Sequence, residues 1–229
     1  MAHFSWAQLI PGVDHHNLHV ATAVVGTGVI VAFGLIGRMA LGTIEKANTP
    51  SPRLTVRGFF ELLTEFIVKL SDSIIGPSQR KLVPLFGALF TFIWFHNMFG
   101  LIPGVVPATD NLNTTLAMGI FSFVVYNYLG LKENGFAYLK HFAGPVLFLA
   151  PLMIVVELIS HLVRPVSLGL RLMANMVGDH NLLAVFHDLF PIGLPVFAYG
   201  LGLFVCFMQA LVFTLMSMVY VSMAVAHEH

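Results

Sequence analysis

Polar and charged side chains recur at helical spacing inside one apolar stretch, PVSLGLRLMANMVGDH at residues 165–180. Arg171 is followed by Asn175 after four residues and by Asp179 after four more. Because side chains four residues apart lie on the same face of an α-helix, these three groups form one polar stripe. A guanidinium stays charged at every physiological pH, so Arg171 can attract a carboxylate and repel cations but cannot relay protons. The pattern indicates a fixed electrostatic element and not an acid–base catalyst.

The stripe extends toward the N-terminus through Arg164 and Glu157, at steps of seven residues. Seven residues are two helical turns less about 20°, so these side chains share a face. From Glu157 to Asp179 a helix covers about 33 Å, close to the hydrocarbon thickness of a bilayer. Arg164 has Glu157 within reach, or can extend to the membrane surface. Arg171 has Ser167 where a paired acid would be expected, which favours a functional role.

The composition is that of a membrane protein. The 229 residues are 57% hydrophobic and 10% charged, whereas about a quarter of the residues in a soluble domain are charged. The formal net charge is zero, so no nucleic-acid partner is indicated. The single cysteine, Cys206, excludes a disulfide framework within the chain. The first residues lack the basic region and the cleavage site of a signal peptide.

Five stretches are long and apolar enough to cross a bilayer, which takes about 20 helical residues. They lie at about residues 20–41, 82–102, 115–131, 145–188 and 194–225. The stretch at about 55–74 has apolar residues at helical spacing and charges on the other face, which predicts an amphipathic helix on the membrane surface. We therefore expect an all-α polytopic membrane protein, with one membrane domain over residues 1–229.

Basic residues predict the orientation, because they accumulate on the cytoplasmic side. Nine of the eleven fall between the first and second spans or after the third: Arg38, Lys46, Arg53, Arg57, Lys69, Arg80, Lys81, Lys132 and Lys140. The N-terminus is then outside and the C-terminus is cytoplasmic. The predicted location is a bacterial plasma (inner) membrane, although a protein encoded in an organelle would look the same.

Three motifs carry a resemblance that covers nearly the whole chain. They are the stretch around Arg171, the sequence LGLFVCFMQALVFTLMSMVYVSMA in the fifth span, and the loop VVPATDNLNTTLAM. Together they resemble subunit a of the F-type (F1Fo) ATP synthase, the membrane stator that faces a rotating ring of c subunits. The arginine motif is the most specific of the three.

The resemblance implies that the last two spans form a long, tilted hairpin against the c-ring. Arg171 would separate two aqueous half-channels and face the carboxylate of a c subunit, so that proton flow drives rotation and ATP synthesis. The chain itself would be non-catalytic, with no cofactor and no metal. The implied partners are the c-ring, the b subunits of the peripheral stalk, other synthase subunits and lipid. The coupling ion, proton or sodium, would depend mainly on the c subunit.

The resemblance also implies roles for single residues. The groups carried over as lining a half-channel or lying beside the gate are Asn175, Asp179, His180, Gln209, Glu157, Arg164, Ser167, Tyr220 and Asn97. His180 occupies the outer half-channel position, and Asp179 before it is interpreted as its partner in a relay. Some family members have a titratable residue at the place of Gly202, so the relay here would rest on the fourth span and water. The loop at 110–113 would shape the outer opening.

Simpler interpretations remain open for several of these groups. Gln209 is equally explained by a hydrogen bond between helices. His96, Asn97 and His161 are typical of helix packing, and Asp179 and His180 of polar groups within a core. A secondary transporter using Glu157, Arg171 and Asp179 is the main alternative function, but it predicts internal repeats or paired broken helices, which the sequence lacks. An intramembrane enzyme is a third class, but no nucleophile–base or HExxH motif supports it.

Overall fold

The computed structural model describes residues 18–41, 55–102, 104–135, 150–189 and 193–225. In these residues the chain forms only helices and turns. The helices are α1 (Leu18–Leu41), α3 (Val56–Ile74), η2 (Pro77–Leu82), α4 (Val83–Phe99), η3 (Ala108–Asp110), α5 (Leu112–Asn134), α7 (Ala150–Leu189) and α8 (Leu194–Val225). Five of the α-helices are long and apolar enough to cross a membrane. The prediction of an all-α polytopic membrane fold is confirmed.

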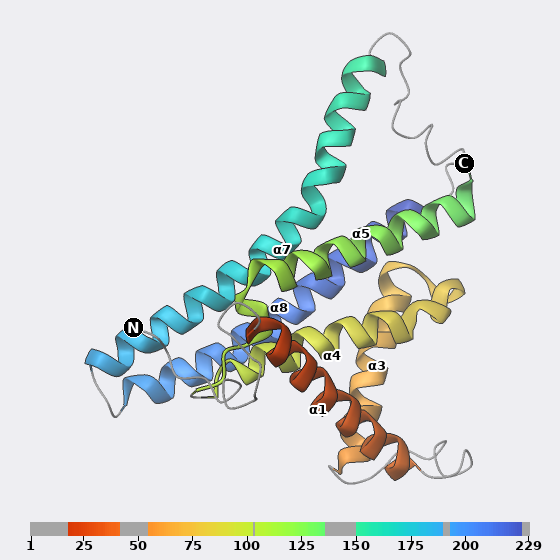
Figure 1. Ribbon diagram of the computed structural model, residues 1–229. Helices are drawn as coiled ribbons and strands as arrows, with labels where there is room; N and C mark the ends of the chain where they lie inside the picture. The colour runs from red at the N-terminus through yellow and green to blue at the C-terminus, as the bar shows by residue number, and fades with distance from the viewer. Residues whose placement is uncertain (1–17, 42–54, 103, 136–149, 190–192, 226–229) are drawn as a thin grey trace.

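Helix α8 is central to the packing. It contacts α4 on one side and both α5 and α7 on the other, and α7 and α8 lie side by side as the predicted hairpin (Figure 1). Helix α3 crosses the bundle and packs against α1 and α4 (Figure 1). The core where α3, α4 and α8 meet is apolar and closely packed, and includes Ile67, Phe86, Phe90, Phe213 and Met218.

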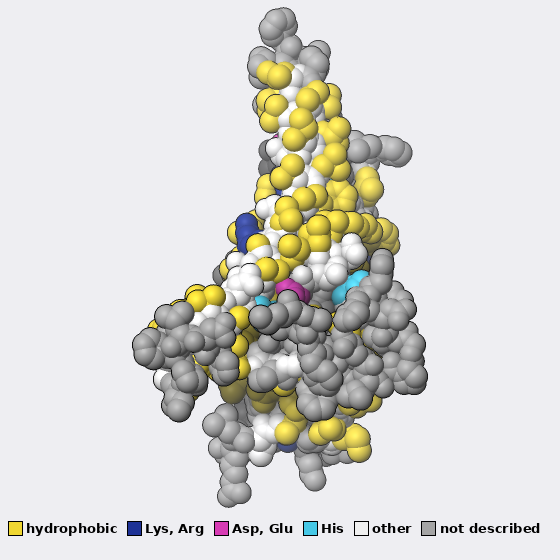
Figure 2. Space-filling view, turned by 60° about the vertical axis from the view of Figure 1, so that its left-hand side comes forward, with side chains coloured by type: hydrophobic (Ala, Val, Ile, Leu, Met, Phe, Trp, Pro, Cys, Tyr) yellow, Lys and Arg dark blue, Asp and Glu magenta, His cyan; other side chains and the backbone are white. Residues whose placement is uncertain are grey.

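Helix α5 has its polar residues inside and its apolar residues outside. Its buried positions are Thr115, Gly119, Ser122, Tyr126 and Gly130, whereas its exposed positions are mainly large and hydrophobic. A soluble helix shows the reverse arrangement. In lipid, small and polar residues gather at helix interfaces, where they allow close approach and hydrogen bonds. The same surface character is visible in Figure 2, where hydrophobic side chains dominate and charged ones are few.

Helices α5 and α7 approach each other through two glycines. A Cβ atom on Gly119 would lie 2.3 Å from the carbonyl oxygen of Pro165, and one on Gly169 would lie 2.9 Å from the Cα of Leu116. Neither position has room for a side chain, because real Cβ atoms do not come this close to backbone atoms. Pro165 also lacks the N–H that would bond back along α7, which is a usual cause of helix bending.

The first part of α7 extends beyond its neighbours. From residue 152 to residue 160 every side chain except Glu157 is exposed, and Figure 1 shows this end of the helix leaving α5 and α8. The exposed residues are mostly large and aliphatic, as expected for a surface that meets lipid or another subunit.

Helix α3 is the amphipathic helix predicted at about 55–74. The side chain of Thr55 caps its first turn by accepting from the N–H of Gly58. The polar face has one-turn ion pairs, such as Lys69 with Glu65 at 2.6 Å. At its end Asp72 binds the guanidinium of Arg80 at 2.7 Å, and these hydrogen bonds lower the pKa of Asp72.

The helix bounds differ from the prediction in two places. The second span ends at Phe99 and not near residue 102, because the chain turns at Gly100. The third span is longer than predicted, since α5 begins at Leu112, where the side chain of Asn111 caps it by accepting from the N–H of Asn113 at 2.9 Å. Residues 145–149 of the predicted fourth span lie outside the described residues.

Candidate functional site

Arg171 lies on the face of α7 that points away from the bundle. Leu168, Leu172 and Met176 point inward and are buried, whereas Arg171 and Asn175 are exposed. Within the described part of the chain, Arg171 makes no ion pair or hydrogen bond. A charge near the bilayer centre costs about 2.5–3.5 kcal/mol, so this guanidinium requires water or a partner that another molecule supplies.

Small and polar residues surround Arg171 on this exposed face. Ser167 precedes it by one turn, and Ala174 and Gly178 lie one and two turns beyond. Short side chains let a second helix come close, as they do at helix interfaces in membranes. Arg171 and Asn175 of the predicted stripe therefore lie on a strip of α7 that is open to a partner, whereas Asp179, Arg164 and Glu157 are partly buried.

The side chain of Asn175 forms a hydrogen bond with α8. Its Nδ2 donates to the Oε1 of Gln209, which is only 5% exposed. The amide nitrogen of Gln209, Nε2, is buried and has no partner among the described residues. A buried donor of this kind is usually satisfied by water or by another group. The interhelical hydrogen bond foreseen for Gln209 is present, one turn beyond Arg171.

On the opposite face of α7, His180 faces the C-terminal end of α4 and the η3 turn. Its Nε2 lies 2.9 Å from the carbonyl oxygen of Gly100, and its Nδ1 lies 3.7 Å from Oδ2 of Asp110. The carboxylate of Asp179 lies 3.7 Å from the point where a side chain on Gly202 would begin. Asp179 of α7 therefore lies beside the space that a larger residue at position 202 of α8 would fill.

Further polar groups are buried near this cluster. Asn97 lies at the end of α4, one turn before Gly100, and Thr109 precedes Asp110. Both side chains are at least 98% buried, and the Oδ1 of Asn97 and the Oγ1 of Thr109 lack a partner in the described residues. Buried polar atoms without protein partners are typical of positions that hold water.

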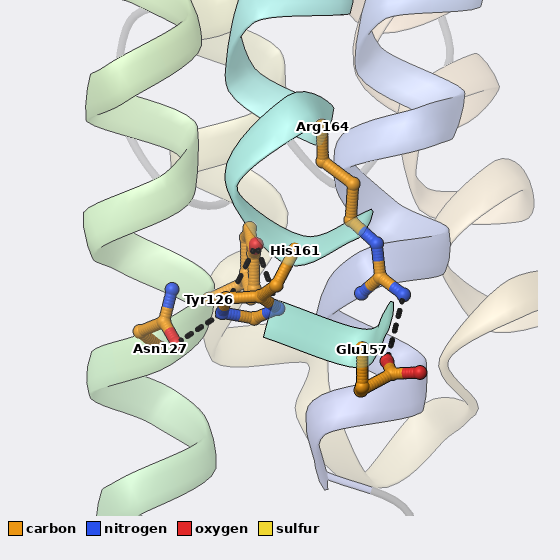
Figure 3. Close-up of polar contacts among 5 residues, drawn as sticks. All are labelled: Tyr126, Asn127, Glu157, His161 and Arg164. Atoms are coloured by element: carbon orange, nitrogen blue, oxygen red, sulfur yellow. Dashed lines mark hydrogen bonds and ion pairs between the residues drawn. The ribbon is translucent and has the colours of Figure 1, made fainter. Parts of the chain in front are cut away.

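A second polar cluster lies toward the other end of α7 (Figure 3). The guanidinium of Arg164 lies 3.4 Å from Glu157 and 5.2 Å from the ring centre of Tyr220 on α8. The predicted pairing of Arg164 with Glu157 is therefore present. Glu157 and Arg164 thus form an ion pair within the stripe, and Arg171 does not take part in it.

His161 is buried beside this ion pair, between α5 and α7, with 6% of its surface exposed. The Nδ2 of Asn127 donates to the carbonyl of Phe123 at 2.8 Å, so its Oδ1 must be the atom that faces His161. That oxygen lies 2.8 Å from Nε2 of His161, which therefore carries the hydrogen. The hydroxyl of Tyr126 lies 3.4 Å from Nδ1 and can donate to it (Figure 3). A neutral imidazole thus fits this position, as helix packing requires.

Removing the amide of Asn127 should loosen this contact. We expect Asn127→Ala to cost about 1–3 kcal/mol, because Nε2 of His161 loses the Oδ1 acceptor at 2.8 Å in a buried place. The readout is the temperature at which the purified complex releases this subunit. Asn113→Ala is the matched control, because Asn113 is an exposed asparagine on the same helix. Equal stability of the two variants would contradict the role assigned to Asn127.

Three residues of these clusters were missed from the sequence: Tyr126, Asn127 and Gly100. A signal for Tyr126 exists, since Thr115, Gly119, Ser122 and Tyr126 recur every three or four residues inside an apolar span. Asn127 and Gly100 give no such signal, because their partners lie far away in the sequence. The described residues contain no group of three or more His, Cys, Asp or Glu side chains that could hold a metal ion.

Comparison with known proteins identifies the family. The family model described as "ATP synthase A chain" matches residues 20–222. The chain belongs to this family. "ATP synthase subunit a" of Bdellovibrio bacteriovorus is 54% identical over 227 residues, which cover 99% of each chain. The proteins of the same name from Sulfurihydrogenibium sp. and Sorangium cellulosum are 41% and 40% identical, over 79% and 86% of this chain and 86% and 78% of their own.

The resemblance inferred from the three sequence motifs is thereby confirmed. ATP synthase A chains are subunits of a larger complex, so the chain functions with other subunits and in a membrane. The match runs through the whole of α4, α5 and α7 and most of α8, including Arg171, Asn175 and Gln209. It supports a synthase subunit and not the secondary transporter that was the alternative.

Proposed function

We propose that this chain is the stator subunit of the Fo membrane sector of an ATP synthase. It passes protons through two aqueous half-channels to and from the carboxylates of a rotating c-ring. The observation that carries the proposal is the exposed guanidinium of Arg171, which has no partner in the described chain. Titratable groups lie on α7 at both sides of it, toward each end of the helix.

The charge of Arg171 accounts for gating. A ring carboxylate that reaches the open strip of α7 meets a permanent cation, which favours its ionised form and the release of its proton. The same cation repels protons and other cations, so ions cannot pass directly from one side to the other. The c-ring must then turn to carry each proton across. Each charge that crosses is worth about 2.3 kcal/mol per 100 mV, which is the energy the synthase collects.

The two half-channels follow from the placement of the polar groups along α7. Asp179 and His180 lie beyond Arg171, together with Asn97 and the loop at 110–113, and form the outer path. Ser167 and the Glu157–Arg164 pair lie before it and form the inner path, with Tyr220 of α8. Gln209 holds Asn175 beside the gate.

The topology of the proposal follows the positive-inside rule. The N-terminus lies outside and the C-terminus in the cytoplasm of a bacterium, with residues 1–229 as one membrane domain. The partners are the c-ring on the open strip of α7, the b subunits of the peripheral stalk and the other subunits of the complex. The chain contributes no catalytic group and needs no cofactor.

Thiol accessibility tests the two half-channels. In the whole synthase, Cys206 is first replaced by serine, which removes the only cysteine of this chain. Single cysteines are then placed at Ser167 and His180 and treated with a membrane-impermeant thiol reagent from one side at a time. We expect Ser167→Cys to react from the cytoplasmic side and His180→Cys from the outer side, because Arg171 separates the two paths.

Leu172→Cys is the control for specific access. Leu172 is fully buried on α7 next to Arg171, so its thiol should react from neither side. Modification of Ser167→Cys and His180→Cys from the same side would contradict two separate half-channels. Modification of each from the side opposite to that expected would reverse the proposed orientation.

A further inference from the structure

The imidazole of His180 is held through one particular nitrogen. Its Nε2 lies 2.9 Å from the carbonyl oxygen of Gly100. A carbonyl oxygen can only accept a hydrogen bond, so Nε2 must carry a hydrogen. The neutral tautomer of His180 is therefore fixed by the backbone of another helix. A hydrogen bond at one ring nitrogen decides which nitrogen remains to bind a proton.

The carbonyl of Gly100 can accept this hydrogen bond because Gly100 lies at the C-terminal end of α4. Gly100 caps α4, and the last carbonyls of a helix have no partner inside the helix. The following N–H groups bond three residues back, from Leu101 to Met98 and from Ile102 to Phe99. The next residue is Pro103, which has no N–H to offer to Gly100.

A glycine is also required at this position by space. A Cβ on Gly100 would lie 3.1 Å from Nε2 of His180 and 2.8 Å from the side chain of Pro107. A side chain here would also meet Cε of Met176, and it would crowd the imidazole beside the carbonyl. Position 100 therefore places and orients His180.

The other ring nitrogen faces a carboxylate. Nδ1 of His180 lies 3.7 Å from Oδ2 of Asp110, and the side chains of both residues are 29% exposed. Asp179 is the neighbouring acid on α7 itself, and the end of α4 contributes the neutral carbonyl of Gly100. Asp110, in the η3 turn, therefore supplies the negative charge that faces Nδ1 from outside α7.

We propose that Nδ1 of His180 is the atom that binds and releases the transported proton on the outer side, and that Asp110 is the residue that positions and stabilises the charged ring. A proton from outer water adds to the Nδ1 lone pair, and the imidazolium pairs with Asp110. The same N–H bond then breaks, and the proton passes to the carboxylate of Asp179 or to water. Nε2 keeps its hydrogen throughout, so no proton passes through the ring from one nitrogen to the other.

This inference rests on the proposed function, and its test is made in the whole synthase in liposomes. ATP synthesis is driven by a constant membrane potential at fixed cytoplasmic-side pH, while the outer-side pH is varied over roughly pH 5–8, the range in which a histidine titrates. The variants are Asp110→Asn, Asp110→Glu and Asn111→Ala. Asn111 belongs to the same loop and caps α5, but has no charge.

We expect Asp110→Asn to lower the rate by about 10-fold, as for loss of a group that assists proton transfer. The midpoint of its pH profile should move to lower pH by about one unit. The protonated ring of His180 loses the opposite charge that stabilises it, and a nearby charge has an effect of about this size. Asp110→Glu should keep roughly half of the rate or more, since it retains the charge. Asn111→Ala should scale the whole profile without moving its midpoint. A profile of Asp110→Asn that is only scaled, like that of Asn111→Ala, would overturn the inference.

Nitrogen NMR of the synthase with ¹⁵N-labelled histidine tests the tautomer directly. The His180 signals are those that disappear in His180→Gln. We expect Nε2 to remain protonated across the range and Nδ1 to titrate, whereas a titrating Nε2 would overturn the assignment.

Arg171→Ala in the same liposomes distinguishes a failure of the inference about Asp110 from a failure of the proposed function. If it abolishes synthesis while Asp110→Asn behaves like Asn111→Ala, only the inference about Asp110 fails. If it leaves synthesis intact, the proposed function fails.

Discussion

Replacing Arg171 with alanine is expected to abolish ATP-driven proton pumping while the synthase still assembles. The side chain is exposed and makes no hydrogen bond or ion pair with the described part of the chain, so its loss should leave the packing of α7 intact. What disappears is the permanent charge that separates the two half-channels. Pumping is measured in inverted membrane vesicles, and passive proton leak is measured after removal of the F1 sector.

Leak through the Arg171→Ala membrane sector should persist or rise, because a proton can then pass without rotation of the ring. Arg80→Ala is the control, since Arg80 is also an exposed arginine but pairs with Asp72 near the end of α3. It should pump at close to the wild-type rate. Pumping by Arg171→Ala at a similar rate would show that Arg171 is not the gate.

The second large effect is expected at Gly119, where α5 meets α7. Gly119→Ala places a methyl group 2.3 Å from the carbonyl oxygen of Pro165, and a backbone atom cannot move aside as the end of a flexible side chain can. Overpacking of this kind costs about 1–3 kcal/mol and occasionally more. We expect a loss of stability in the upper part of that range, seen as subunit release from the purified synthase at a lower temperature.

Gly87→Ala is the matched control for this prediction. Gly87 also lies within a spanning helix, α4, but a Cβ atom there would meet nothing within 4 Å. Since alanine favours a helix over glycine by up to about 1 kcal/mol, this variant should be neutral or slightly more stable. Opposite signs for the two substitutions are the expected result. A stable Gly119→Ala variant would mean that α5 and α7 do not approach as closely as described.

The sequence alone was sufficient for features that depend on local composition and helical period. Apolar residues in runs of about 20 must form helices in lipid, so the five spans and the amphipathic helix α3 could be predicted. The polar stripe of Arg171 and Asn175 follows from a spacing of four residues, and it lies on one face of α7 as expected. The pairing of Arg164 with Glu157 was also local, within two turns of one helix.

Contacts between distant segments were decided by the tertiary structure. His180 meets the carbonyl of Gly100 across 80 residues of sequence, and His161 meets Asn127 across 34. Hydropathy and helical period indicate which face of a helix is polar. They do not indicate which other helix packs against that face, or how the two helices are positioned along their axes. That choice depends on shape, and here it depends on Gly119 and Gly169, which let α5 and α7 come together. The tertiary structure therefore decided which polar groups are paired inside the bundle, and left Arg171 exposed for a partner outside it.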